Sequence, residues 1–170
     1  IHRIKNGGKL PMFTSCCPAW IRFAEDKYPD LLDNISTCRS PMQMVASTVK
    51  ALYKGEKKHI HVAIMPCSAK KDEGKREKFG GTVDFVLTTQ EVVRMIREHG
   101  IHFSHLTETL PDNPFEEYTG AGVIFGATGG VMEAALRYAA EKILGNKLEK
   151  LDFVEVRGTE GIKTASYKLG

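Results

Sequence analysis

The order of hydrophobic and polar positions predicts two helices in the first third of the chain. Apolar residues recur at helical spacing after Pro18 and after Pro41, and proline is favoured in the first turn of a helix. The first helix is expected to end near residues 28–29. The second is expected to be capped by Ser40 and stopped by Gly55. Its core-facing positions are predicted to be Met44, Val45, Thr48 and Leu52.

In the middle of the chain, the pattern of apolar positions predicts two strands and another helix. Residues 59–66 carry an almost unbroken apolar run in their second half, which is typical of a strand covered on both faces. Residues 83–88 form the second predicted strand. Thr89 is expected to cap a helix over 90–99, and Gly100 is expected to end it. The inward positions of this helix are predicted to be Val92, Val93 and Ile96.

In the last third of the chain, the sequence pattern predicts a loop, more strands and a long helix. The polar stretch 106–119 contains two prolines and is expected to be a surface loop. The elements predicted after it are a strand over 122–125, a glycine turn at 126–130, a helix from Val131, and strands over 151–156 and 162–167. The core-facing positions of the helix are predicted to be Met132, Ala135, Leu136 and Ala139.

Strands that alternate with helices predict an α/β fold, with a mostly parallel four- to five-stranded sheet and flanking helices. In such a sheet, ligands gather beyond the carboxyl ends of the strands. Cys67 and the glycine turn at 126–130 both fall at predicted strand ends. The pattern therefore indicates a site near these two segments.

Length and composition narrow the class of protein. A chain of 170 residues, 42% hydrophobic and 26% charged, can form one compact domain or two small lobes and is neither disordered nor collagen-like. No apolar run approaches the roughly 18 residues that cross a bilayer, so we expect no membrane span. The first residues lack a secretory signal, and the start at Ile1 suggests a piece of a longer protein. The net charge of +3 is spread over short clusters, which favours a solvated basic face over nucleic-acid binding.

The four cysteines carry the candidate chemistry. Adjacent Cys16 and Cys17 rarely form a disulfide with each other, because the required geometry is strained. A domain of this length needs no disulfides for stability, so its thiols are buried small side chains, metal ligands or reactive groups. Cys16 and Cys17 precede a predicted helix, whose amide dipoles favour a thiolate or an anion. Cys67 follows a predicted strand, and Lys70 places a cation nearby that favours a thiolate or an anionic ligand. Buried loop thiols and a capped strand end are the purely structural alternatives.

Several longer motifs identify a family resemblance. Residues 14–20, Thr-Ser-Cys-Cys-Pro-Ala-Trp, and residues 65–73, Met-Pro-Cys-Ser-Ala-Lys-Lys-Asp-Glu, closely match the first two signature motifs of iron-iron hydrogenases. Residues 84–89 and 125–137 also resemble stretches of this family, in the family's order and spacing. The whole chain, 1–170, therefore resembles part of the catalytic domain, as one of its lobes. The third motif, with two more cysteines, is expected beyond Gly170.

The resemblance implies a metal site of two parts, a [4Fe-4S] cubane and a two-iron subcluster joined to it through a cysteine, together called the H-cluster. Cys17 and Cys67 would be cubane ligands. Cys16 would pass protons to and from the bridging amine of the two-iron subcluster, and Lys70 would donate a hydrogen bond to one of its cyanides. Cys38 falls outside the motifs and is interpreted as an ordinary thiol.

Further residues complete the implied site. Met65, Pro66 and Phe125 would form an apolar pocket around the two-iron unit and keep water out. Ser36 lies at the position of a hydroxyl in the family's proton path, and Glu73 is a nearby carboxylate of the second motif. A serine in a loop between helices is more commonly a cap, which is the alternative for Ser36.

The implied reaction is the reversible reduction of protons to H2, with electrons from ferredoxin or a similar carrier. Residues 1–170 hold two of the four cubane ligands, so the chain alone is expected to bind the full site poorly and to be inactive. The remainder of the hydrogenase chain, or a second chain, would supply the rest. The expected compartment is the cytoplasm, with the periplasm as the alternative.

Two other functions compete with this interpretation. The first is a non-enzymatic iron-sulfur protein in cluster assembly, scaffolding or sensing, which has less reason to keep Cys16, Lys70 and the Met65 pocket. The second is an interaction domain, or a degenerate paralogue that holds a phosphate at Gly126–Gly130. That turn lacks the lysine and hydroxyl of a P-loop and does not match GxGxxG, which weakens the phosphate alternative.

Overall fold

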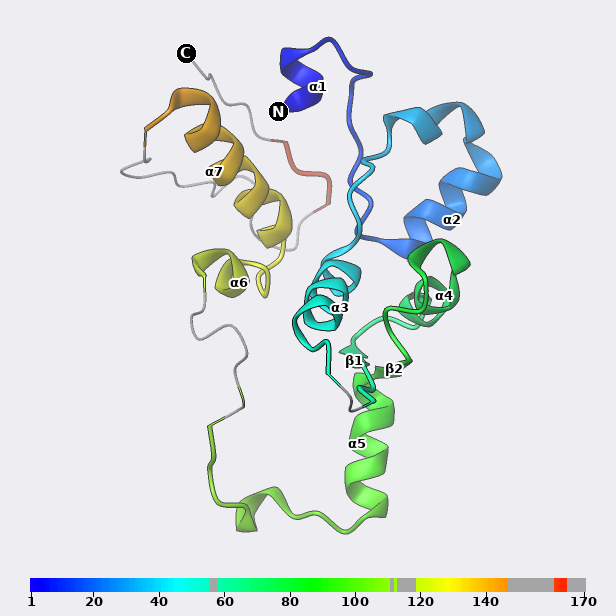
Figure 1. The fold of residues 1–170 in the computed structure, drawn as a ribbon, viewed down its shortest axis with the longest axis vertical. Helices are drawn as coiled ribbons and strands as arrows, with labels where there is room; N and C mark the ends of the chain where they lie inside the picture. Colours follow the sequence, from blue (N-terminus) through cyan, green and yellow to red (C-terminus); the bar gives the residue numbers. More distant parts are fainter. Residues whose placement is uncertain (56–57, 111, 113–118, 147–160, 165–170) are drawn as a thin grey trace. The chain divides into compact units, whose positions relative to one another are not determined.

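The computed structural model describes residues 1–55, 58–110, 112, 119–146 and 161–164, which form two compact units (Figure 1). One unit is Asn6–Thr107, and the other combines Ile1–Lys5 with Glu108–Gly170. In the described part of the chain, every helix is too short or too polar to cross a membrane. The helical elements are α1 (His2–Lys5), α2 (Pro18–Lys27), η1 (Pro29–Asn34), α3 (Pro41–Leu52), α4 (Ala69–Lys75), η2 (Glu77–Phe79), α5 (Thr89–Glu98), η3 (Phe103–His105), α6 (Gly120–Ile124) and α7 (Gly130–Leu144).

The described residues of the unit Asn6–Thr107 include a parallel two-stranded sheet. Strand β1 (Val62–Met65) pairs with β2 (Phe85–Thr88), with Val62 opposite Phe85 and Met65 opposite Thr88. Helix α4 lies in the crossover between the two strands, as a parallel connection requires (Figure 1). The α/β class with a parallel sheet is therefore confirmed, and the described residues contain two of the predicted strands.

The first two helices begin where the prolines predict. Helix α2 starts at Pro18 and ends at Lys27, close to the predicted end, and η1 begins two residues later at Pro29. Helix α3 starts at Pro41, and the Oγ of Ser40 accepts a hydrogen bond from the backbone N–H of Gln43 at 3.3 Å. It ends at Leu52, before Gly55 is reached. Local cap chemistry alone is enough to place these helix starts.

The predicted core face of α3 is wrong. Its buried residues are Met42, Gln43 and Ala46, whereas Met44, Val45, Thr48 and Leu52 are all exposed. Met42 and Ala46 join Val83 in the core cluster, and Ala63, Met65 and Val86 of the strands pack against it. Apolar residues occur on several sides of this helix, so periodicity alone does not select one face. The adjacent strands select it instead.

Strand β1 also differs from its predicted environment. Its side chains alternate: Val62 and Ile64 are exposed, while Ala63 and Met65 are half-buried against the core cluster. The prediction of a strand covered on both faces is therefore wrong for the described residues. A continuous apolar run allows burial on either face, and only packed neighbours show which face is covered.

Helix α5 is capped one residue earlier than predicted, by Thr88. The Oγ1 of Thr88 accepts the backbone N–H of Glu91 at 3.2 Å, and the Oε2 of Glu91 accepts the backbone N–H of Thr88 at 2.7 Å. With Lys71 hydrogen-bonded to the same carboxylate, this capping box lowers the pKa of Glu91 to about 2. Gly100 follows with a φ of +64°, a conformation that favours glycine. Of the predicted inward residues, Val92 and Ile96 are half-buried and Val93 is exposed.

The second unit contradicts the predicted strand over 122–125. Helix α6 covers most of this segment, and the Oγ1 of Thr119 caps it by accepting the N–H of Gly122 at 3.4 Å. A short apolar run between glycines fits a helix as well as a strand, which explains the error. The glycine turn at 126–130 therefore follows a helix, and the argument that placed it at a strand end fails.

Helix α7 starts one residue before the predicted Val131 and is followed by Gly145, which has a φ of +75°. Glu133 and Ala140 are buried, Leu136 and Ala139 are half-buried, and the predicted inward residues Met132 and Ala135 are exposed. The predicted strand 151–156 and the end of 162–167 lie outside the described residues. The part of the latter that is described, 162–164, is not a strand, and the described part of the loop 106–119 up to residue 112 is irregular.

Gly130 is expected to be irreplaceable by alanine. A Cβ added at this position would lie 1.7 Å from the carbonyl oxygen of Ile124, whereas a Cβ at Gly126 would meet the carbonyl oxygen of Val123 at 3.5 Å. Because backbone cannot yield as a flexible side chain can, Gly130→Ala should destabilise the unit by about 3 kcal/mol. Gly126→Ala serves as the matched control and should change stability little. Urea unfolding checks both variants, and equal midpoints would contradict the close packing.

Candidate metal centre

Cys17 lies at the N-cap of helix α2. Its Sγ accepts a hydrogen bond from the backbone N–H of Trp20 at 3.4 Å, and the residue is exposed. The structure thus confirms the local position that the sequence predicted for this residue. Its thiol is not in a disulfide.

Cys67 directly follows strand β1 and its neighbour Pro66, and it is a free, half-buried thiol. Its carbonyl oxygen accepts the backbone N–H of Lys70 at 3.3 Å, as helix α4 begins. The carboxyl edge of the parallel sheet therefore carries this thiol, as predicted. Pro66 is exposed, and Met65 is half-buried beside the core cluster.

Lys70 joins the two cysteine motifs. Its ammonium donates to the carbonyl oxygen of Cys16 at 2.9 Å and to the Oε2 of Glu73 at 2.6 Å. The side chains of Lys70 and Glu73 are only 8% and 5% exposed. An ammonium has three N–H donors, and the described residues occupy two of them here. The remaining donor is held in a buried position next to Cys16, which is itself half-buried.

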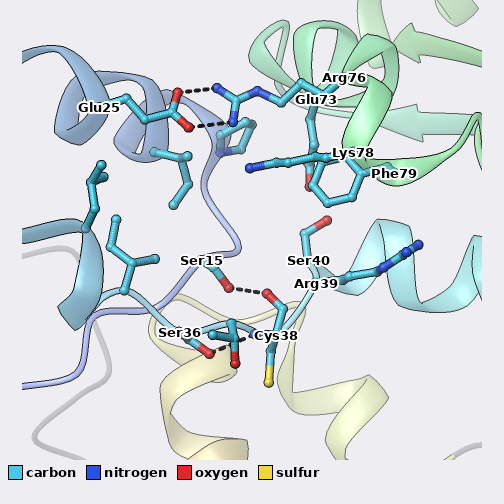
Figure 2. Close-up of a pocket in the computed structure, with 15 residues that line it drawn as sticks. Ser15, Glu25, Ser36, Cys38, Arg39, Ser40, Glu73, Arg76, Lys78 and Phe79 are labelled. Carbon is cyan, nitrogen blue, oxygen red and sulfur yellow. Dashed lines mark hydrogen bonds and ion pairs between the residues drawn. The ribbon is translucent and has the colours of Figure 1, made fainter. Parts of the chain in front are cut away.

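A pocket of about 470 Å³ has Glu73 of this ion pair among its lining residues (Figure 2). Two residues that the family resemblance singled out line this pocket: Ser36, at the position of the family's proton path, and Glu73, the carboxylate of the second motif. The Oγ of Ser36 accepts the backbone N–H of Cys38 at 3.2 Å, so Ser36 does cap a turn. The Oγ of Ser15 donates to the carbonyl oxygen of Cys38 at 2.5 Å, which ties the first motif to the same turn. Cys38 is exposed and lines the pocket as well.

Phe125 belongs to the other unit, at the C-terminal end of α6, where it is exposed. Its predicted place in the apolar wall around the two-iron subcluster stays a prediction.

A set of charged residues that the sequence analysis missed joins helices α2 and α4. Arg22 donates from Nε and Nη2 to the two carboxylate oxygens of Asp72, at 3.0 and 3.1 Å. Arg76 donates from both terminal nitrogens to Glu25, at 2.9 and 2.6 Å. These hydrogen bonds lower the pKa of Glu25 and of Asp72 below their ordinary values. The spacing of Arg22 and Glu25 on a predicted helix, and the i,i+4 spacing of Asp72 and Arg76, was the available signal.

The described residues contain the free thiols Cys17 and Cys67 of the signature motifs, and not a complete ligand set for a metal centre. Among them, no group of three or more His, Cys, Asp or Glu side chains could hold a metal ion. Exposed Cys17 and half-buried Cys67 fit two of the four thiolates that a [4Fe-4S] cluster requires.

Comparison with known families settles the family. The sequence model described as "Iron only hydrogenase large subunit, C-terminal domain" matches residues 1–170. The chain belongs to the iron-only hydrogenase large-subunit family. It is 44% identical to iron hydrogenase 1 of Clostridium pasteurianum, over 99% of this chain and 31% of that protein. It is 45% identical to the periplasmic [Fe] hydrogenase large subunit of Nitratidesulfovibrio vulgaris, over 98% of this chain and 42% of that protein.

Solved structures agree with this membership. An apo variant of the [FeFe]-hydrogenase HydA1 from Chlamydomonas reinhardtii matches 95% of this chain and 44% of its own, with a TM-score of 0.74 and 43% identity. More distant relatives include the cytosolic iron-sulfur assembly component 3 of Rattus norvegicus, 34% identical over 89% of this chain and 35% of that protein. The chain therefore spans about a third to under half of the relatives' length.

Proposed function

We propose that residues 1–170 are part of the catalytic domain of an iron-iron hydrogenase, which reduces protons to H2 reversibly with electrons from ferredoxin or a similar carrier. The observation that carries the proposal is the buried Lys70, whose ammonium contacts Cys16 and so joins both cysteine motifs. Identity of 44–45% to two iron hydrogenases over nearly the whole chain supports the same function.

Cys17 and Cys67 would hold the cubane through two of its four cysteine ligands. The remaining two ligands would come from the rest of the hydrogenase chain or from another chain. When bound, the H-cluster supplies the electron and hydride chemistry of H2 formation. The fragment alone is proposed to be inactive, because half of the ligands lie outside it.

The proposed role of Lys70 is to hold an anionic ligand of the metal, such as cyanide. Its side chain is 8% exposed, and electrostatic attraction is stronger in such a dry position than in water. Glu73 neutralises the ammonium and fixes its direction through the 2.6 Å hydrogen bond. With the carbonyl of Cys16 as second acceptor, the third N–H donor has one direction left to point.

The proposed path for protons runs through Cys16. Its half-buried thiol carries an S–H that can be given up and regained, which is the requirement for general acid-base work. Ser36 and Glu73 line one pocket and offer a hydroxyl and a carboxylate for further transfer steps. Met65, Pro66 and Phe125 are proposed to exclude water from the two-iron unit.

A non-enzymatic role in iron-sulfur assembly is the alternative, because several relatives carry that name at 32–34% identity. The higher identity to hydrogenases over a similar span favours the hydrogenase function over the assembly role. Relatives are named both periplasmic and cytosolic, and we propose the cytoplasm, with the periplasm as the alternative.

The decisive experiment is hydrogen evolution by the complete natural protein that carries residues 1–170, after anaerobic cluster reconstitution and maturation. We expect H2 from reduced ferredoxin, and Cys16→Ala should lower the rate by about 100-fold or more while [4Fe-4S] content is kept. Cys38→Ala makes the same chemical change at an exposed thiol and should leave the rate unchanged. A protein that holds [4Fe-4S] but evolves no H2 would instead be assigned to the assembly class.

A further inference from the structure

Four charged side chains, Arg22, Glu25, Asp72 and Arg76, form a closed set that we name the α2–α4 clamp. Its two main pairs are Arg22–Asp72 and Arg76–Glu25, each with two hydrogen bonds between 2.6 and 3.1 Å. Two longer contacts close the set, Arg22 to Glu25 at 3.7 Å and Arg76 to Asp72 at 3.5 Å. Each arginine therefore contacts both carboxylates, and charges of opposite sign alternate around the set.

The clamp joins the two helices that follow the proposed cubane ligands. Cys17 is the N-cap of α2, and Cys67 lies just before α4. Arg22 and Asp72 each lie five residues after the cysteine of their own motif. Helices α2 and α4 lie side by side in the same unit (Figure 1). At the cysteine end, Lys70 adds a third connection through the carbonyl of Cys16.

Helix α4 contributes no large apolar side chain to its contact with α2. The sequence of α4, Ala-Lys-Lys-Asp-Glu-Gly-Lys, contains no apolar side chain larger than alanine, and its buried residues are Lys70 and Glu73. On α2, the buried residues are Pro18 and Ala24, both small. The charged contacts are therefore the directional side-chain interactions that join this helix pair in the described part of the chain.

The chemistry of the clamp suits a positioning role. Arg76 is 11% exposed at its side chain and meets Glu25 in a two-fold, fork-shaped contact, visible in Figure 2. Such a contact sets an angle as well as a distance, because guanidinium and carboxylate are both planar. Both carboxylates are charged at neutral pH, and the arginine hydrogen bonds lower the pKa of Glu25 and of Asp72 further below their ordinary values.

We propose that the α2–α4 clamp sets the separation of Cys17 and Cys67 and thereby the geometry in which their thiolates meet one iron-sulfur cluster. The inference rests on the proposed function, in which these two cysteines ligate a cubane. The four charged residues are positioning residues, since they act on the cluster only through the helices that carry its ligands.

The test uses the complete natural protein loaded with the [4Fe-4S] cluster alone. Glu25→Gln and Arg76→Lys each remove the fork-shaped contact with little change in side-chain size. We expect iron loss to a chelator to become about tenfold faster and the EPR spectrum and reduction potential of the cluster to shift. Asp26→Asn is the matched control on the same helix, because Asp26 is 71% exposed at its side chain and pairs with its sequence neighbour Lys27.

A variant that restores the charge pattern distinguishes a positioning role of the clamp from a general effect on protein stability. The quadruple variant R22E/E25R/D72R/R76E inverts every charge and keeps their alternation, so it should restore the EPR spectrum and slow iron loss. If the quadruple variant does not fold, the iron loss, EPR spectra and reduction potentials of the two single variants test the proposal. If the Glu25→Gln and Arg76→Lys proteins keep the wild-type iron retention, EPR spectrum and reduction potential, the positioning role of the clamp is overturned. The proposed function is not affected by that result. A wild-type protein that takes up no [4Fe-4S] cluster would overturn the proposed function, and the clamp with it.

Discussion

Replacing Cys17 or Cys67 by serine is expected to lower the [4Fe-4S] content of the complete natural protein at least tenfold after anaerobic reconstitution. Loss of a residue that merely supports a metal ligand costs about 10- to 100-fold in affinity, and loss of a ligand costs no less. A serine hydroxyl does not ionise as a thiol does and is a poor substitute for iron's preferred thiolate. Iron and sulfide analysis, with the visible absorption of the cluster, measures the effect.

Two other cysteines serve as controls for this experiment. Cys38→Ser changes an exposed thiol outside both motifs and should leave the cluster content unchanged. Cys16→Ser should also retain the cubane, because Cys16 is proposed to move protons and not to bind iron. Full cluster content in Cys67→Ser, or its loss in Cys16→Ser, would contradict the roles assigned to these thiols.

Lys70→Met is expected to destabilise the unit Asn6–Thr107 by about 3–5 kcal/mol, the usual cost of breaking a buried ion pair from one side. The substitution leaves the carboxylate of Glu73, 5% exposed at its side chain, without its 2.6 Å cationic partner. It also removes the hydrogen bond to the carbonyl of Cys16, the connection between the two cysteine motifs. Urea unfolding at neutral pH, followed by circular dichroism, measures the change.

The neighbouring lysine provides the matched control. Lys71 lies on the same helix and pairs with Glu91 at 2.8 Å, but both side chains are substantially exposed, so Lys71→Met should change stability little. The double variant K70M/E73Q should recover part of the lost stability, because no buried charge then remains unpaired. Equal stabilities of Lys70→Met and Lys71→Met would show that the buried pair does not stabilise the fold.

Helix starts were predictable because they depend on neighbouring residues in sequence. Pro18 and Pro41 begin helices as expected, and the capping chemistry at Thr88 differs from the prediction by one position. Helix faces were less predictable. Met42 and Ala46 are buried in place of Met44 and Val45, because the face that packs is chosen by the strands beside it. The predicted strand over 122–125 was wrong for a related reason, since its few apolar residues fit a helix as well as a strand.

For the candidate site, too, the residues could be singled out from the sequence but their contacts could not. Cys16, Cys17, Cys67 and Lys70 were found from the sequence because each motif is continuous and its chemistry depends on residues a few positions apart. The contact of Lys70 with Cys16 joins residues 54 positions apart, and no local pattern predicts it. Burial of the Lys70–Glu73 pair is likewise a property of the packed helices.

The sequence by itself determined the family, the α/β class, the helix starts and the two cysteine motifs, since these depend on local spacing and on motifs read along the chain. Only the tertiary structure decided which helix faces are buried, that Lys70 connects the motifs, and that Arg22, Glu25, Asp72 and Arg76 form a clamp. The clamp pairs join residues 50 and 51 positions apart. Such contacts exist only after the parallel crossover has brought α4 alongside α2, because side-chain charges act over a few ångströms in space and not along the chain.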